Sequence, residues 1–180
     1  KLKIMKAGYK LNKVFFKLRE GDKSSNSNEC AIGGKWIEKT TDDFFKGKRV
    51  VLFSLPGAFT PTCSTYQLPD YEKLYPDFKE KGIEEIYCIS VNDAYVMNAW
   101  GAAQGVENVK LIPDGGGEFT RKMGMLVYKN PEGFGVRSWR YAAIVENKSV
   151  SRWFEEPGFR DDANDDPYGV SSPQAVLEAI

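Results

Sequence analysis

Two apolar runs dominate the pattern of hydrophobic and polar positions along the chain. Residues 49–55 (RVVLFSL) and 85–91 (EIYCISV) contain few polar positions, which is typical of strands that are buried on both faces of a sheet. A predicted helix follows each run, over 60–81 after the first and over 94–105 after the second. A third predicted helix lies over 118–123. Strands that alternate with helices in this way predict an α/β layered fold.

The remaining elements are predicted from shorter signals. We expect an edge strand over 34–40, a brief helix over 42–45 that Thr41 caps, and a strand over 109–112. Later segments predict a hairpin of strands 136–146 and 149–154 about Asn147-Lys148, a loop over 157–169, and a helix that starts at Ser172-Pro173.

The helix after the first apolar run has a marked beginning. Thr60 followed by Pro61 is typical of a helix cap and first helical residue, which would put Cys63 at the third helical position. Gly82 would end the helix, and Pro69 and Pro76 must kink or break it.

Length and charge narrow the function classes. The 180 residues suit one compact domain, and 25 basic residues balance 25 acidic ones. Neither nucleic acid nor an anionic membrane is therefore an expected partner, and no apolar run approaches the roughly 18–20 residues that cross a bilayer. Three widely spaced cysteines favour a reducing compartment, with cytoplasmic localisation as the default. A removed leader stays open, because the sequence does not begin with methionine.

The chain contains no histidine. This absence excludes Cys-His and Ser-His nucleophile–base pairs and mixed Cys/His zinc sites. We therefore expect no metal, and any reactive thiol must be activated without imidazole.

Cys63 has the surroundings of a reactive thiol. The N–H groups and partial positive charge of a helix start stabilise a thiolate. Thr60 and Thr62 add hydroxyl donors, and Pro61 stiffens the backbone. Ionisation alone adds only a few-fold in rate, because a more stable thiolate is also a weaker nucleophile. Large acceleration needs donors that hold the electrophile, and Arg137 or Arg140 could supply them.

The segment from Pro56 to Ser64, PGAFTPTCS, resembles the P-x-x-x-T-x-x-C active-site motif of the peroxiredoxins, in particular the type-five subfamily. The resemblance covers nearly the whole chain. It includes residues 41–57, 91–94, 98–100, 111–115, 137–142 and 166–169. It implies a thioredoxin-like fold: one three-layer α/β/α domain over 1–180 with a mixed central sheet.

The resemblance also implies roles for particular residues. Cys63 would be the peroxidatic cysteine, Thr60 would bind and polarise the peroxide, and Pro56 would shield the sulfenic acid. Arg140 would be the active-site arginine. Thr62 is placed in the substrate site on its own chemistry, because its hydroxyl can donate to a molecule bound beside the sulfur. Members of the family use no metal or organic cofactor and are often homodimers with active sites near the interface.

Two departures from the family pattern matter. Gln67 stands where many relatives carry a histidine, so a titrating group is missing there. Residues 89–180 contain no cysteine, which removes the C-terminal resolving cysteine of some relatives. We therefore expect a one-cysteine cycle that an external thiol completes, with glutathione and glutaredoxin favoured over thioredoxin.

Several alternatives stay open. Cys88 is expected to pack in its strand, Cys30 is either a bystander or a resolving thiol, and Arg137 is either part of the site or a structural ion pair. The Trp100 and Tyr141 side chains are expected in the core or a dimer contact. The acidic run 155–166 is expected to be a solvated face. A peroxide sensor of the same fold is the competing function, and a general thiol–disulfide oxidoreductase is a weaker one.

Overall fold

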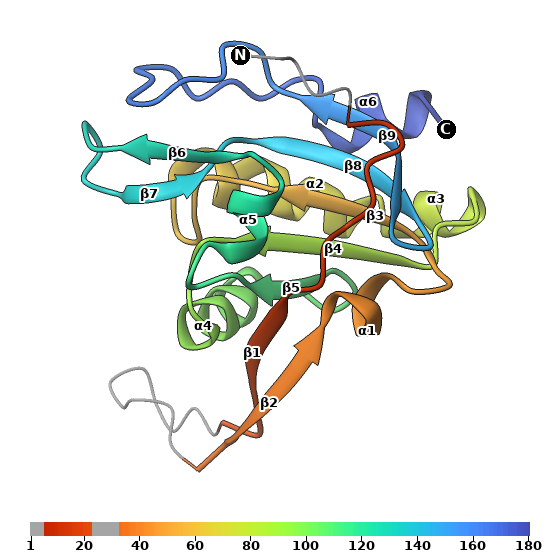
Figure 1. Cartoon of the computed structure of the whole chain (residues 1–180), viewed down its shortest axis with the longest axis horizontal. Helices are drawn as coiled ribbons and strands as arrows, with labels where there is room; N and C mark the ends of the chain where they lie inside the picture. Colours follow the sequence, from red (N-terminus) through yellow and green to blue (C-terminus); the bar gives the residue numbers. More distant parts are fainter. Residues whose placement is uncertain (1–5, 23–32) are drawn as a thin grey trace.

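A mixed five-stranded sheet forms the centre of the computed structural model, which describes residues 6–22 and 33–180 (Figure 1). The strand order is β5-β4-β3-β8-β9. The first three of these strands run parallel, and β8 and β9 are antiparallel to their neighbours. The bounds are β3 (Arg49–Ser54), β4 (Glu85–Ser90), β5 (Lys110–Pro113), β8 (Tyr141–Glu146) and β9 (Ser149–Glu155).

Both faces of this sheet are covered, as the two apolar runs predict. Along β3, Val50 and Leu52 belong to one buried cluster, whereas Val51 and Phe53 belong to the other. The first cluster includes residues of α1 (Thr41–Phe45) and α5 (Glu118–Lys122). The second packs against α2 (Leu68–Lys73), α3 (Tyr75–Glu80), α4 (Ala94–Gln104) and α6 (Pro173–Glu178). The three-layer α/β/α arrangement with a mixed sheet is confirmed.

Two small sheets lie outside the central one. Strand β1 (Phe15–Glu20) pairs with β2 (Lys35–Thr40), and β6 (Leu126–Lys129) pairs with β7 (Gly135–Ser138). The prediction of one strand over 136–146 is wrong: β7 belongs to a small sheet and β8 to the central one, and the chain leaves strand conformation at Trp139 and Arg140. Arg140 therefore lies at a junction between two sheets rather than inside a strand.

The short turns follow their predictions with one correction. Asn147 and Lys148 have positive φ angles of 44° and 70°, as a tight hairpin turn requires. The Ser172 hydroxyl accepts the Ala175 N–H at 3.3 Å and caps α6. Thr40, not Thr41, caps α1, because the Asp43 carboxylate accepts the Thr40 N–H at 2.6 Å. The Thr41 hydroxyl instead donates to the Asn12 carbonyl at 2.8 Å.

The predicted helix over 60–81 is divided. Helical residues begin at Pro61 and pass through a π turn, η1 (Cys63–Gln67), into α2. Leu74 (φ −92°, ψ 8°) separates α2 from α3, and Gly82 follows with φ 79°. The wide π turn precedes Pro69, whose ring would clash with the carbonyl four residues back in a regular α-helix. Among the described residues, no helix is long and apolar enough to span a bilayer.

Candidate active site

Cys63 lies in the first turn of the helix that follows β3. The first helical hydrogen bond runs from the Ser64 N–H to the Thr60 carbonyl at 3.0 Å. The N–H groups of Thr62 and Cys63 come before it and therefore have no acceptor within the helix. The helix start predicted at Thr60-Pro61 is therefore confirmed. The Cys63 side chain is fully buried, in the apolar layer between the sheet and this helix.

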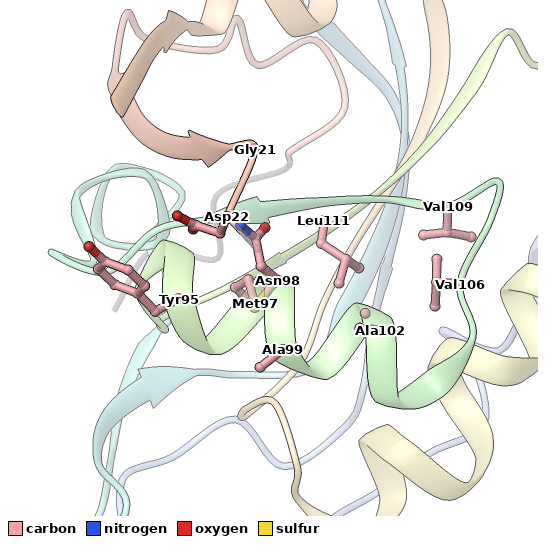
Figure 2. A pocket seen from close by; sticks show the side chains of 11 residues that line it. Gly21, Asp22, Tyr95, Met97, Asn98, Ala99, Ala102, Val106, Val109 and Leu111 are labelled. Carbon is pink, nitrogen blue, oxygen red and sulfur yellow. The ribbon is translucent and has the colours of Figure 1, made fainter. Parts of the chain in front are cut away.

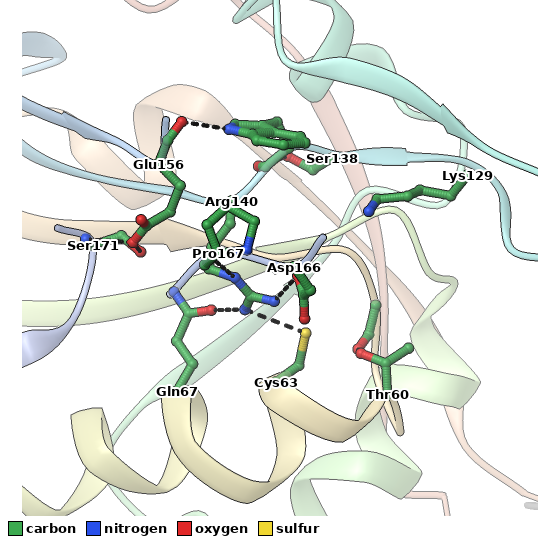
Figure 3. Close-up of polar contacts among 12 residues, drawn as sticks. Thr60, Cys63, Gln67, Lys129, Ser138, Arg140, Glu156, Asp166, Pro167 and Ser171 are labelled. Atoms are coloured by element: carbon green, nitrogen blue, oxygen red, sulfur yellow. Dashed lines mark hydrogen bonds and ion pairs between the residues drawn. The ribbon is translucent and has the colours of Figure 1, made fainter. Parts of the chain in front are cut away.

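The Arg140 guanidinium reaches the sulfur from the far end of the chain. Its Nη1 lies 3.5 Å from the Cys63 sulfur and also donates to the amide oxygen of Gln67 (Figure 3). Arg140 is only 1% exposed. Its position between β7 and β8 turns the side chain toward the helix that carries Cys63 and Gln67. Cys63 and Arg140, which the family resemblance assigns to one active site, are therefore in contact, and Gln67 lies beside them.

The opposite edge of the guanidinium is held by the segment after β9. Nε donates to the Pro167 carbonyl at 3.1 Å, and Nη2 lies 2.5 Å from the Asp166 carboxylate. Burial opposes the charge of Arg140, but the attraction of Cys63 and Asp166 outweighs burial and raises the pKa of the guanidinium above its ordinary value. Arg140 is therefore a fixed cation at the sulfur.

Glu156 anchors the segment that carries Asp166 and Pro167. Its buried carboxylate accepts the Gly169 N–H at 2.7 Å, the Ser171 N–H at 2.9 Å and the Ser171 hydroxyl at 2.8 Å. Its backbone N–H donates to the Arg140 carbonyl at 3.2 Å. The expectation of a solvated face over 155–166 is wrong for Glu156, which is buried. Asp166 is exposed as expected, yet its carboxylate contacts the arginine (Figure 3).

The loop before the helix carries the other predicted site residues. The Thr60 hydroxyl donates to the Gly57 carbonyl at 2.7 Å, which leaves the lone pairs of its oxygen for a donor on a substrate. Pro56 is buried. Thr62 is half-buried, and its hydroxyl makes no hydrogen bond within the described part of the chain. Phe59 has a φ of 61°, a positive value that non-glycine residues seldom adopt. Its side chain is 57% exposed.

Arg137 approaches the same loop from β7. Its Nη1 lies 3.4 Å from the Pro56 carbonyl oxygen. A Cβ atom on Gly57 would lie 2.5 Å from that nitrogen, so only glycine leaves room for the guanidinium there. Within 6–22 and 33–180, no carboxylate lies within 4 Å of Arg137, so the alternative of a structural ion pair finds no partner among these residues.

The other cysteines and aromatic residues take no direct part in this geometry. Cys88 is buried on β4, and both burial and the nearby Cys63 raise the pKa of its thiol. Cys30 lies outside the described residues. Trp100 is buried and donates to the Ser64 hydroxyl at 3.0 Å, and Tyr141 is buried in the core. In the described ranges, no three potential ligands among cysteine, aspartate and glutamate are grouped to hold a metal ion.

A surface hollow of about 610 Å³ runs along α4 and β5 (Figure 2). Tyr95, Asn98, Ala102 and Leu111 are among the residues that line it. None of the residues around Cys63 lines this hollow, so the site and the hollow are separate features.

Comparison with known proteins shows the family. The Redoxin family model matches residues 20–166. A peroxiredoxin from Rhizobium etli is 68% identical over 146 residues, which span 81% of this chain and 82% of that protein. The hybrid peroxiredoxin hyPrx5 of Haemophilus influenzae is 46% identical over 96% of this chain and 65% of its own length. The Plasmodium falciparum antioxidant protein, a 1-Cys peroxiredoxin, superposes with a TM-score of 0.86 at 35% identity over 96% and 97% of the two chains. The expected thioredoxin-like fold is confirmed by these matches.

Proposed function

This chain belongs to the peroxiredoxin family of thiol-dependent peroxidases, and we propose that it reduces hydrogen peroxide and alkyl hydroperoxides through the thiolate of Cys63. The observation that carries the proposal is the 3.5 Å contact between the Cys63 sulfur and a guanidinium that is fixed by three other atoms of the fold. We assign the chain to the type-five subfamily on the residues that match it from Pro56 to Ser64.

Arg140 retains one donor for the substrate. A guanidinium has five N–H groups. Four of those on Arg140 are directed at Pro167, Gln67, Cys63 and Asp166, which leaves one on Nη2. We assign this N–H to the oxygen that leaves as the O–O bond breaks, where preorganised donors stabilise developing negative charge most effectively.

Thr60 would hold the other end of the peroxide. Because its hydroxyl proton points to the Gly57 carbonyl, its oxygen accepts the O–H of the hydroperoxide. Thr60 would thereby align the O–O bond with the Cys63 sulfur, and the buried Pro56 would screen the product from solvent. Thr62 is assigned to the wall of the substrate site.

The reaction balances without a metal or an organic cofactor. The thiolate attacks one peroxide oxygen, the S–O bond forms, and the O–O bond breaks. The departing hydroxide or alkoxide takes a proton from solvent to give water or the alcohol, and Cys63 becomes a sulfenic acid. A first external thiol condenses with the sulfenic acid and releases water, and a second external thiol restores Cys63 as a disulfide of the two external thiols leaves.

We further propose a one-cysteine cycle with glutathione and glutaredoxin as reductants. Cys88 is the other cysteine in the described residues, and its buried, protonated thiol is poorly suited to resolve Cys63. The Plasmodium relative, named a 1-Cys peroxiredoxin, supports this reading. Thioredoxin with Cys30 as resolving residue is the alternative.

Exposed aromatic side chains and the overall composition bear on assembly and localisation. Phe59 and Tyr66, which flank the Cys63 turn, are 57% and 55% exposed. Large exposed aromatic side chains around a site suit a protein interface, so we propose a homodimer that covers them. The balanced charge and sparse cysteines support a cytoplasmic protein.

The decisive experiment is steady-state consumption of hydrogen peroxide with glutathione and glutaredoxin, beside thioredoxin and its reductase. Wild type, Cys63→Ser and Cys30→Ser are compared. Turnover with glutaredoxin that survives Cys30→Ser and is lost in Cys63→Ser supports the one-cysteine peroxidase. Turnover with thioredoxin alone, lost in Cys30→Ser, would assign Cys30 as the resolving residue. Stoichiometric oxidation without turnover in either system would favour a sensor.

A further inference from the structure

Arg137 differs from the other partly buried arginines in having no carboxylate partner. Arg19 pairs with Asp22 at 2.6 Å, and Arg140 pairs with Asp166 at 2.5 Å. Arg137 is half-buried, yet within the described ranges no acidic side chain lies within 4 Å of it. A partly buried charge ordinarily has a compensating partner, because its desolvation is costly. The guanidinium is therefore poised for an anion that the fold itself does not provide.

The guanidinium lies at the loop that leads into Cys63. Nε donates to the Phe134 carbonyl at 3.0 Å, and Nη1 makes a long contact of 3.4 Å with the Pro56 carbonyl. Those contacts use two of its five N–H groups and leave three. A Cβ on Gly57 would be 2.5 Å from Nη1 of Arg137 and 3.4 Å from the Thr60 side chain. The cation is therefore in direct contact with the backbone that holds Thr60.

Electrostatics agree with this location. Burial lowers the pKa of Arg137 from its ordinary value, and the negative charge of Cys63 opposes that effect. The guanidinium remains charged at neutral pH, because arginine is not deprotonated in proteins. Arg140 cannot take the same role, since four of its five donors are already directed at protein groups.

We propose that Arg137 binds the carboxylate of an anionic substrate whose reactive end reaches Cys63, and so selects carboxylate-bearing substrates over neutral ones. This inference rests on the proposed reaction at Cys63. A planar guanidinium with free N–H groups matches a carboxylate in geometry and charge. The carboxylate can come from either of two sources: a hydroperoxide that carries it, or a reducing thiol that carries it to the sulfenic acid.

The first arm of the test measures oxidation of Cys63 by linoleic acid hydroperoxide and by its methyl ester, both below micelle-forming concentrations. Wild type, Arg137→Gln and Arg137→Lys are compared, and each rate constant is divided by the same variant's rate constant with hydrogen peroxide. If the hydroperoxide supplies the carboxylate, the acid-to-ester ratio falls about tenfold in Arg137→Gln, the loss expected for one charge-assisted contact. Arg137→Lys should retain part of the ratio, and salt should lower it in the wild type.

The second arm measures reduction of oxidised Cys63 by 3-mercaptopropionate and by 2-mercaptoethanol. If the thiol supplies the carboxylate, the ratio of these rate constants falls about tenfold in Arg137→Gln. Arg152→Gln is the matched control, because it removes the charge of an exposed arginine on β9 and should change neither ratio.

A fall in either ratio supports the inference and identifies the source of the carboxylate. If Arg137→Gln slows the acid, the ester and both thiols equally, Arg137 only supports the Pro56 loop, and the inference is overturned. The inference is also overturned if neither the acid-to-ester ratio nor the ratio of the two thiols changes. A wild-type Cys63 that does not react with hydrogen peroxide would instead contradict the proposed function.

Discussion

Arg140 Nη1 lies 3.5 Å from the Cys63 sulfur, although 77 positions separate the two residues in the chain. The contact exists because the chain leaves strand conformation at Arg140, between β7 and β8, and because Asp166 and Pro167 hold the far edge of the guanidinium. The cation is thus in place before a peroxide arrives. Donors that need no rearrangement during the reaction stabilise a transition state most strongly.

Arg140→Lys should lower the second-order rate constant with hydrogen peroxide by about 100-fold or more, in the range expected when a preorganised donor is removed. A lysine ammonium keeps the charge but cannot reproduce the planar array of N–H groups. The thiolate fraction of Cys63 should change much less. Stopped-flow peroxide oxidation and thiolate absorbance at neutral pH measure the two quantities on the same samples. Equal losses in both would mean that ionisation, not positioning, is the main contribution of Arg140.

Gln67→Met should lower the peroxide rate constant by about tenfold. The substitution nearly preserves side-chain volume but removes the acceptor of the Arg140 Nη1 bond, a contact to a charged group of about 1.5–3 kcal/mol. Gln67→His is the informative comparison, because it introduces a group that titrates between about pH 5 and 8. A new inflection in the pH–rate profile of Gln67→His, absent from the wild type, is expected. A wild-type inflection that Gln67→Met abolishes would contradict the positioning role.

Cys88→Ala should keep peroxidase activity within about twofold, while Cys63→Ser should abolish it. Burial and the nearby Cys63 raise the pKa of the Cys88 thiol, so it remains protonated and a poor nucleophile. The cost of Cys88→Ala should appear in stability, at about 1 kcal/mol, the typical effect of a point substitution. Urea denaturation and peroxide consumption separate these effects. A folded but inactive Cys88→Ala protein would refute the assignment of a packing role.

Lys6→Met should stabilise the protein at pH 7, and its advantage should shrink as the pH rises. Lys6 is 8% exposed, and burial lowers its pKa to about 8 against the attraction of Glu155, from 10.5 in the unfolded chain. Between pH 8 and pH 10.5 the unfolded chain binds more protons at this lysine than the folded chain, so the free energy of unfolding rises with pH. The contribution of Lys6 to that free energy is therefore most favourable above about pH 10.5 and is lost as the pH falls through about 8.

Urea denaturation of wild type and Lys6→Met at pH 7 and pH 9.5 measures this difference. Lys10→Met, at an exposed lysine, is the matched control and should show no such pH dependence relative to wild type. A stability difference between wild type and Lys6→Met that is constant from pH 7 to 9.5 would contradict the prediction.

The sequence predicted the elements whose signals are local. The runs that form β3 and β4 are apolar throughout, and the cap and proline at Thr60-Pro61 mark the start of the helix that bears Cys63. The strands β1 and β6 were missed, because half-exposed strands of four to six residues with interspersed charges resemble loops. The π turn leaves no local signal except the later Pro69.

The site was predictable in part. Residue chemistry alone indicated Cys63, and the family resemblance was needed to choose Arg140 as the active-site arginine. Glu156 and Asp166 were missed because they lie in an acidic stretch whose composition is typical of solvent-exposed loops. Only their long-range contacts, with Ser171 and with Arg140, bring them to the site. Such contacts depend on tertiary structure, and no periodicity along the sequence encodes them.

The residues of the site are synthesised at different times, because Cys63 and the residues that hold Arg140 lie far apart along the chain. Cys63 emerges 103 residues before Asp166, since 166 − 63 = 103. At roughly 5–20 residues per second, synthesis leaves the thiol without its completed guanidinium clamp for about 5–20 s. In that interval the cysteine has the reactivity of an unassisted thiol in a nascent chain. If Cys63 reacts as proposed, rapid reaction with peroxide must wait until Arg140, Asp166 and Pro167 have been made and have packed against the helix, so the nascent cysteine is spared rapid oxidation.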